Sequence, residues 1–135
     1  TGGGENHRMG LYDMIMIKDN HVDFAGGIPQ AIQRVKQYLE EKGKELKIEI
    51  EVRDFSELNL VMENGGVDRI MLDNFTPEEL STAVKQINGA YETEASGGIN
   101  EENIEAYAAT GVDFISVGTL THHIQSLDMS LKAEH

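Results

Sequence analysis

Short apolar stretches alternate with longer amphipathic stretches along most of the chain. The short ones cover residues 14–18, 48–52, 69–73, 91–96 and 114–117, and their length and apolar character are typical of buried strands. Between them, apolar residues recur three and four positions apart, which predicts helices that bury one side. The chain is therefore expected to consist of consecutive strand–helix units.

Four helices are predicted from this periodicity and from the residues that cap helix ends. The clearest covers 28–42, where one apolar stripe includes Ile32 and Leu39 and Gly43 ends the helix. Ser56 is expected to cap a helix that runs to 64, and the Thr76-Pro77-Glu78-Glu79 start predicts a capping box for a helix to about 87. Asn100 is expected to cap the last helix, which Gly111 would close.

The predicted strand ends recur at a nearly constant interval. Glu51, Asp73, Ser96 and Gly118 are 22, 23 and 22 residues apart, and each interval holds one three-turn helix and two short loops. This spacing predicts an α/β fold with parallel strands of the (β/α) barrel type. The rival is a doubly wound open sheet, which would normally show a dinucleotide glycine fingerprint that is missing here.

The number of units predicts an incomplete TIM-like barrel. Four or five units do not close eight strands, even with one more short strand at 129–131, and the chain begins at Thr1 within a glycine-rich segment. Residues 1–135 are therefore expected to be a partial (β/α) barrel domain, the C-terminal part of a longer enzyme. Such a piece would expose strand edges and apolar interior, so we expect weakened stability.

Composition narrows the classes of partner. The net charge is −13, which disfavours nucleic acid and anionic membrane surfaces, so an anionic substrate would need a local cluster of cations. There is no cysteine, which excludes disulfides and thiolate metal sites. No apolar run approaches the roughly 20 residues of a membrane helix, and no signal peptide is visible. A cytoplasmic protein is the expectation.

Two glycine loops follow consecutive predicted strands and point to phosphate. Ser96-Gly97-Gly98 ends one strand, and Gly118 and Thr119 end the next. Glycines leave backbone N–H groups accessible, and the N-terminus of a following helix adds positive potential. The loops after the last two strands commonly bind phosphate in barrels of this type.

Charged residues gather at the other strand ends, where parallel sheets place their chemistry. His7 and Arg8 alone favour ordinary surface, whereas Lys18 follows four apolar residues and would need an anionic partner if buried. Asp73 ends an apolar strand, which favours function over capping of the next turn.

Two further positions allow more than one interpretation. Glu49 and Glu51 share one side of their strand, and for Glu49 a solvated position is about as plausible as a function. His122 is favoured over His123 because it is closer to the second glycine loop.

Taken together, the motifs resemble the quinolinate phosphoribosyltransferase family. They are GGGENHRMGL, MIKDNH, IEIEV, IMLDNF, EASGGI and GVDFISVGTLTH, which span residues 2–122 in the family's order. The resemblance implies transfer of phosphoribosyl from phosphoribosyl pyrophosphate to quinolinate with decarboxylation, giving nicotinate mononucleotide, pyrophosphate and CO2 with the help of Mg²⁺. A paralogue that uses another aromatic acid and a non-catalytic phospho-ligand module are the alternatives.

The resemblance also implies residue roles. His7, Arg8 and Lys18 would bind the quinolinate carboxylates, while Glu51 and Asp73 would hold the ribose hydroxyls and Mg²⁺ and stabilise positive charge at the anomeric carbon. The residues implied to cradle phosphate are Ser96, Gly97, Gly98, Gly118, Thr119 and His122. Lys18, Glu51 and Asp73 are thus the catalytic candidates. The segment between Glu51 and Asp73 is one residue longer than in the family, and we place the extra residue in the Asn64-Gly65-Gly66 loop. If the extra residue lies elsewhere, Glu49 could take the Glu51 role.

Family members are longer than this chain. They carry an N-terminal α/β sandwich domain and an earlier strand with essential arginines, and their sites form across a homodimer or larger homo-oligomer. The chain by itself is therefore expected to be inactive.

Overall fold

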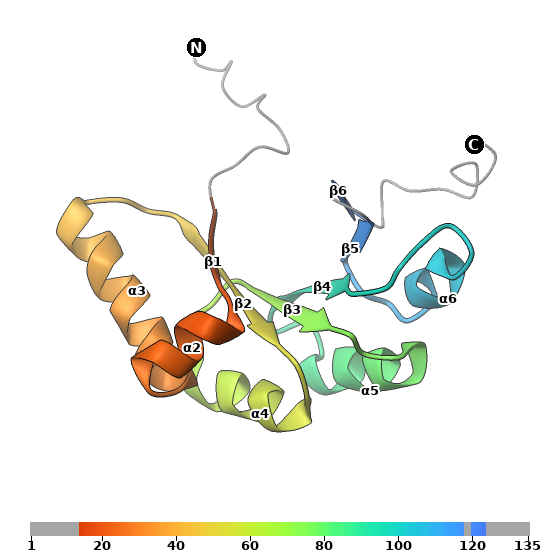
Figure 1. Cartoon of the computed structure of the whole chain (residues 1–135), viewed down its shortest axis with the longest axis horizontal. Coiled ribbons are helices and arrows are strands. Elements are labelled where there is room, and N and C mark those ends of the chain that lie inside the picture. The colour runs from red at the N-terminus through yellow and green to blue at the C-terminus, as the bar shows by residue number, and fades with distance from the viewer. Residues whose placement is uncertain (1–13, 118–119, 124–135) are drawn as a thin grey trace, which may run out of the picture.

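The computed structural model describes residues 14–117 and 120–123, which form one six-stranded sheet with five helices (Figure 1). The strands are β1 (Met14–Ile17), β2 (Lys47–Val52), β3 (Arg69–Asp73), β4 (Glu92–Ser96), β5 (Phe114–Val117) and β6 (Leu120–His123). The helices are α2 (Asp19–Ala25), α3 (Ile28–Lys42), α4 (Phe55–Asn64), α5 (Pro77–Ile87) and α6 (Ile104–Ala108).

The strand order in the sheet is the same as the order along the chain. β1 to β5 are parallel neighbours, and only β6 is antiparallel to β5. Helices connect the parallel strands and lie in an arc along one side of them (Figure 1). This arrangement confirms the predicted α/β class, and it agrees with part of a (β/α) barrel.

The two faces of the sheet differ because side chains alternate along each strand. One face carries Ile48, Ile50, Ile70, Leu72 and Ile115, which are 0–4% exposed and form the core with the apolar stripes of the helices. The opposite face, called the polar face below, carries Glu49, Glu51, Arg69, Met71, Asp73, Glu92, Glu94, Ser96 and Phe114.

Helices α3 and α5 match the predictions closely. α3 begins at Ile28, and the left-handed backbone of Gly43 ends it with an N–H that donates to Leu39. At the start of α5 the Thr76 hydroxyl accepts from the Glu79 N–H, and the Glu79 carboxylate accepts from the Thr76 N–H at 3.0 Å. The predicted capping box is therefore confirmed.

Two helix starts were predicted wrongly. α4 is capped by Asp54, whose carboxylate accepts from the Glu57 N–H at 2.9 Å, and Ser56 lies inside the helix. α6 begins at Ile104 after Asn103, because Asn100 uses its side chain to accept from Glu102 N–H in a separate preceding turn. In both cases another Asp or Asn nearby competes for the capping role.

Two elements were not predicted. α2 follows β1 after Lys18, so the segment expected to be a polar strand end is the start of a short helix. β6 pairs with β5 through register partners that include Ile115 and His122. The possible strand at 129–131 lies outside the described residues.

Candidate active site

Three of the predicted site residues meet at the carboxyl end of the sheet. Glu51 lies near the end of β2, and Asp73 and Ser96 are the last residues of β3 and β4. Asp73 is the register partner of Ser96, and Glu51 is the partner of Met71, two residues before Asp73. All three side chains are partly exposed, so a ligand at this end of the polar face can reach them.

The double-glycine loop after β4 is fixed against the loop after β3. The Asn74 N–H donates to the Ser96 carbonyl at 2.9 Å, and Asn74 itself has a φ of 62°. Gly97 has a φ of 94°, and a Cβ atom there would lie 2.6 Å from the Asn74 side-chain oxygen and 2.8 Å from its backbone nitrogen. Only glycine fits this close approach, which brings the loop next to Asp73.

The helix after this loop begins later than the sequence predicted. α6 has five residues and starts at Ile104, so its N-terminus is separated from Gly98 by a turn. The Asn103 side-chain amide donates to the Gly98 carbonyl at 2.9 Å and holds that turn on the loop. The expected contribution of a helix N-terminus at Asn100 is therefore wrong, and the loop's own N–H groups remain the candidate anion site.

Lys18 directly follows β1, as predicted, but its side chain is exposed rather than buried. Its backbone N–H donates to the ring Nδ1 of His21 at 3.2 Å. The argument that burial would force an anionic partner on Lys18 therefore does not apply here. Its position, at the same end of the sheet as Glu51, keeps it available to an anionic ligand.

Several predicted site residues cannot be placed. His7, Arg8, Gly118 and Thr119 lie outside the described residues. The backbone of His122 belongs to β6, and its side chain is likewise outside the description.

Glu49 is buried on the polar face rather than solvated. It is 3% exposed and is hydrogen-bonded to Glu94, which is 2% exposed. Burial, that hydrogen bond and the negative charge of Glu94 together raise the pKa of Glu49 to about 9, whereas the Arg69 charge acts in the opposite direction. The Glu49 Oε2 atom is buried without a hydrogen-bond partner. Glu49 thus lies one layer below the rim that Glu51 occupies.

Arg69 links three strands across this buried layer. Its Nε atom lies 3.3 Å from a carboxylate oxygen of Glu92, and its Nη1 atom lies 3.3 Å from one of Glu94. The guanidinium carbon lies 3.6 Å from the ring centroid of Phe114 on β5, a cation–π contact. The sequence analysis missed this cluster. The available signal was the alternation of Glu92, Glu94 and Ser96 along one strand.

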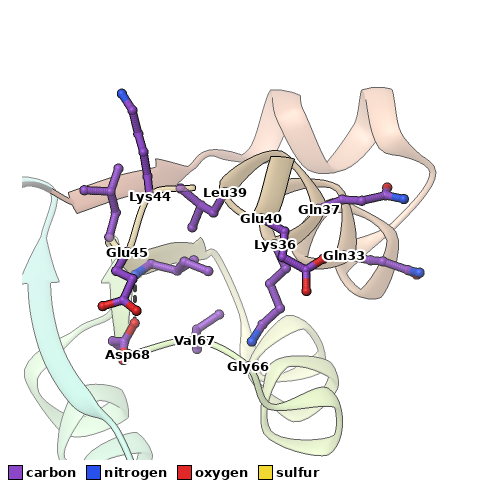
Figure 2. A pocket seen from close by; sticks show the side chains of 12 residues that line it. Gln33, Lys36, Gln37, Leu39, Glu40, Lys44, Glu45, Gly66, Val67 and Asp68 are labelled. Atoms are coloured by element: carbon purple, nitrogen blue, oxygen red, sulfur yellow. Dashed lines mark hydrogen bonds between the residues drawn. The ribbon is translucent and has the colours of Figure 1, made fainter. Parts of the chain in front are cut away.

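A large cavity lies at the opposite end of the strands. It has a volume of about 730 Å³ and is lined by the C-terminal half of α3 and by residues just before β2 and β3, including Lys36, Glu40 and Asp68 (Figure 2). Asp68 has a structural role there, because its carboxylate accepts a hydrogen bond from the Ile48 N–H at 2.9 Å. The cavity contains none of the predicted site residues, and the glycine loop and rim carboxylates lie elsewhere.

Within the described part of the chain, no group of three or more His, Asp or Glu side chains could hold a metal ion. No helix of the described residues is long and apolar enough to cross a membrane.

Comparison with known proteins decides the family. Residues 1–132 match the family described as quinolinate phosphoribosyl transferase, C-terminal domain. The chain belongs to this family. Among curated relatives, the chloroplastic nicotinate-nucleotide pyrophosphorylase [carboxylating] of Arabidopsis thaliana is 46% identical over 98% of the chain and 42% of its own length. The probable nicotinate-nucleotide pyrophosphorylase [carboxylating] of Bacillus subtilis is 43% identical over 97% of the chain and 44% of its own length.

Solved structures of the quinolinate phosphoribosyltransferase family share the fold. The nicotinate-nucleotide pyrophosphorylase of Francisella tularensis superposes with a TM-score of 0.71 at 41% identity, covering 81% of this chain and 37% of that one. That of Ehrlichia chaffeensis gives 0.71 at 38% identity, covering 87% and 42%. The chain thus spans about two fifths of the proteins that it matches.

Proposed function

We propose that the protein to which this chain belongs transfers the phosphoribosyl group of phosphoribosyl pyrophosphate to quinolinate, with loss of CO2. The products would be nicotinate mononucleotide and pyrophosphate, as in the biosynthesis of NAD. The observation that carries the proposal is the register of Asp73 with Ser96, which joins a rim carboxylate to a double-glycine loop. The relatives' names support the same reaction.

The geometry suits a reaction in which positive charge develops on a sugar. Loss of pyrophosphate leaves the anomeric carbon with cationic character, which nearby carboxylates stabilise. Glu51 and Asp73 lie on adjacent strands at the open rim and can accept hydrogen bonds from the ribose hydroxyls. The Ser96–Gly98 loop would bind phosphate beside them, because its glycines bring backbone N–H groups close to a ligand. Gly118, Thr119 and His122 are proposed to complete the phosphate site.

Quinolinate would bind at the β1 end of the rim. Its two carboxylates call for clustered cations, and we assign them to His7, Arg8 and Lys18. This places the acceptor ring on one side of Glu51 and the sugar phosphate on the other, so the carboxylates lie between the two substrates.

The residues present fit Mg²⁺ as a shared ion rather than one held by protein alone. Mg²⁺ prefers hard oxygen ligands and is usually bound by one or two carboxylates together with substrate phosphates. Glu51 and Asp73 supply that number of carboxylates, and the described residues hold no larger metal cluster. When bound, the ion would neutralise the departing pyrophosphate.

Assembly and compartment are part of the proposal. The protein is proposed to act as a homodimer or larger homo-oligomer in the cytoplasm, without nucleic acid or membrane partners. Several plant relatives are named as chloroplastic or mitochondrial, so fractionation of the source cells is the test of compartment.

The test is an assay of the full-length protein with quinolinate, phosphoribosyl pyrophosphate and Mg²⁺. Formation of nicotinate mononucleotide and CO2 in equal amounts is expected, and the Asp73→Asn variant should lose most of the rate. Turnover of another aromatic acid but not quinolinate would indicate the paralogous activity. Binding of phosphate esters without any turnover would indicate a non-catalytic module.

Calorimetric titration of the same protein with quinolinate separates binding from chemistry. The Lys18→Ala variant should lose quinolinate binding, whereas phosphate binding at the Ser96–Gly98 loop should persist. Equal quinolinate affinity in wild type and variant would contradict the placement of the acceptor at the end of β1.

A further inference from the structure

The Arg69 cluster is the feature of the polar face that the proposed reaction does not use. Arg69 is 4% exposed, and no other lysine or arginine of the described residues is buried. Lys18 and Arg53, which lie at strand ends, are exposed. A cation held in the middle of a sheet needs anionic partners, and the two carboxylates of β4 provide them.

The two carboxylates differ in how far their charge is screened. The Glu92 side chain is 44% exposed, so water screens much of its charge. The Glu94 side chain is 3% exposed. It lies 3.3 Å from the Arg69 guanidinium and is hydrogen-bonded to Glu49, and Arg69 supplies the positive charge in this group. The contact of Arg69 with Phe114 fixes the guanidinium over this layer.

Glu94 lies directly below the candidate phosphate loop. It precedes Ser96 by two residues on the same face of β4, a distance of about 7 Å along the strand. The Glu94 charge can act on a bound anion over such a distance, because about 7 Å is shorter than the Debye length of about 8 Å in physiological salt. An uncompensated Glu94 would therefore repel an anion bound at the loop.

We propose that Arg69 is a positioning residue that holds and balances the Glu94 carboxylate, so that the Ser96–Gly98 loop can bind the phosphorylated donor. The proposal rests on the proposed function and assigns Arg69 no contact with substrate. It predicts that substitutions of Arg69 and Glu94 act on donor affinity with opposite signs, because one removes the balancing charge and the other removes the charge to be balanced.

The test is a double-mutant cycle in the full-length enzyme, with initial rates measured as a function of phosphoribosyl pyrophosphate concentration. Arg69→Met should raise the KM for this donor about 5- to 10-fold, with kcat changed less than 2-fold. Glu94→Gln should leave the KM equal to that of wild type or lower it, and the double variant should return the KM to within about 2-fold of wild type. Arg69→Lys keeps the charge and should rescue most of the KM.

Salt dependence separates charge from loss of structure. The effect of Arg69→Met should be largest at low salt, where the Debye length is about 30 Å, and should shrink where it is about 3 Å. The control is Arg53→Met, which removes the same charge from an exposed arginine paired with Glu57 at 2.6 Å. This control should leave the donor KM within 2-fold of wild type.

Each outcome bears on one proposal. A wild-type protein that makes no nicotinate mononucleotide overturns the proposed function before any variant is compared. An active wild type whose KM rises in both single variants, or in neither, overturns the role of Arg69. A KM that rises in neither variant would follow if Glu94 took up a proton once Arg69 was removed. A rise that is the same at all salt concentrations would mean a packing effect and would also overturn it.

Discussion

Glu49 and Glu51 show how strongly two residues on one strand can differ. They are two positions apart on the same face of β2, yet Glu49 is buried against Glu94 whereas Glu51 is partly exposed at the rim. Burial raises the pKa of Glu49 to about 9, which leaves it uncharged near neutral pH. Position along the strand, rather than residue type, therefore decides which of the two carboxylates lies at the open rim.

The raised pKa of Glu49 makes stability depend on pH in a defined direction. Between its ordinary value of 4.5 and about 9, the folded chain keeps a proton that the unfolded chain releases, so the free energy of unfolding falls as pH rises through this interval. Glu49→Gln removes this dependence and preserves a donor to Glu94. The variant should unfold with a flatter pH profile and be more stable than wild type at pH 8, on the order of 2 kcal/mol.

Urea denaturation measured from about pH 5 to about pH 9 tests this difference, because these limits span the interval between the unfolded and folded pKa values of Glu49. Glu51→Gln is the matched control, because it changes the same residue type on the same face at the exposed rim. Parallel pH profiles for wild type and Glu49→Gln would show that Glu49 is ionised in the folded chain.

At the scale of elements, the same aspartate contact joins neighbouring strands twice, at the end of the sheet opposite the candidate site. The Asp68 carboxylate accepts from the Ile48 N–H at 2.9 Å, and the Asp113 carboxylate accepts from the Thr93 N–H at 3.0 Å. Each aspartate lies just before its strand, 20 residues after the strand residue that it contacts. The contact satisfies a backbone donor at the start of the preceding strand.

Removal of this contact should destabilise the chain without touching the candidate site. Asp113→Ala leaves a partly buried N–H of Thr93 without its acceptor and should lower the free energy of unfolding by about 1–3 kcal/mol. Asp68→Ala should have a similar effect, and Asp23→Ala, at an exposed helix position, should change it by less than about 0.5 kcal/mol. Chemical denaturation curves of the three variants give these values.

The contact between the loops after β3 and β4 predicts a difference between two neighbouring glycines. Gly97→Ala would place a Cβ atom 2.6 Å from the Asn74 side chain and force the loops apart, whereas an added Cβ at Gly98 meets open space. Both have positive φ, so both substitutions carry backbone strain, and only Gly97→Ala adds the clash. Titration with inorganic phosphate should therefore show a larger loss of affinity, by about 10-fold or more, for Gly97→Ala than for Gly98→Ala.

Elements were predictable from sequence where one local signal was sufficient. The stripe of α3 and the capping box of α5 are local patterns, and both helices begin where expected. The start of α4 was missed because Asp54 and Ser56 are both good caps. The segments that form α2 and β6 are short and show no clear hydrophobic period, so they were missed. The Arg69 cluster depends on the register between strands, which no single stretch of sequence reveals.

At the scale of the whole molecule, the sheet is open in the described residues. β1 forms one edge, and it pairs only with β2 there. Exposed edges favour association between chains. Phe24 on the neighbouring α2 is 84% exposed and adds apolar surface next to this edge.

This open architecture predicts that the chain alone unfolds over a broad temperature range and associates in a concentration-dependent manner. Calorimetry together with sedimentation velocity at several protein concentrations tests this. A sharp two-state transition of a monomer would contradict it. A longer relative, such as the probable nicotinate-nucleotide pyrophosphorylase of Bacillus subtilis, measured in the same way, is the control and should melt at a higher temperature.

The identity of strand order and chain order has a consequence for how the molecule is made. Each of β2 to β5 pairs with the strand that precedes it in the sequence, so within the described residues no parallel pairing waits for a distant segment. The N-terminal strands can therefore associate while later residues are still being synthesised on the ribosome, and each new strand–helix unit finds its template already in place. Growth of the sheet can thus follow translation, one unit at a time.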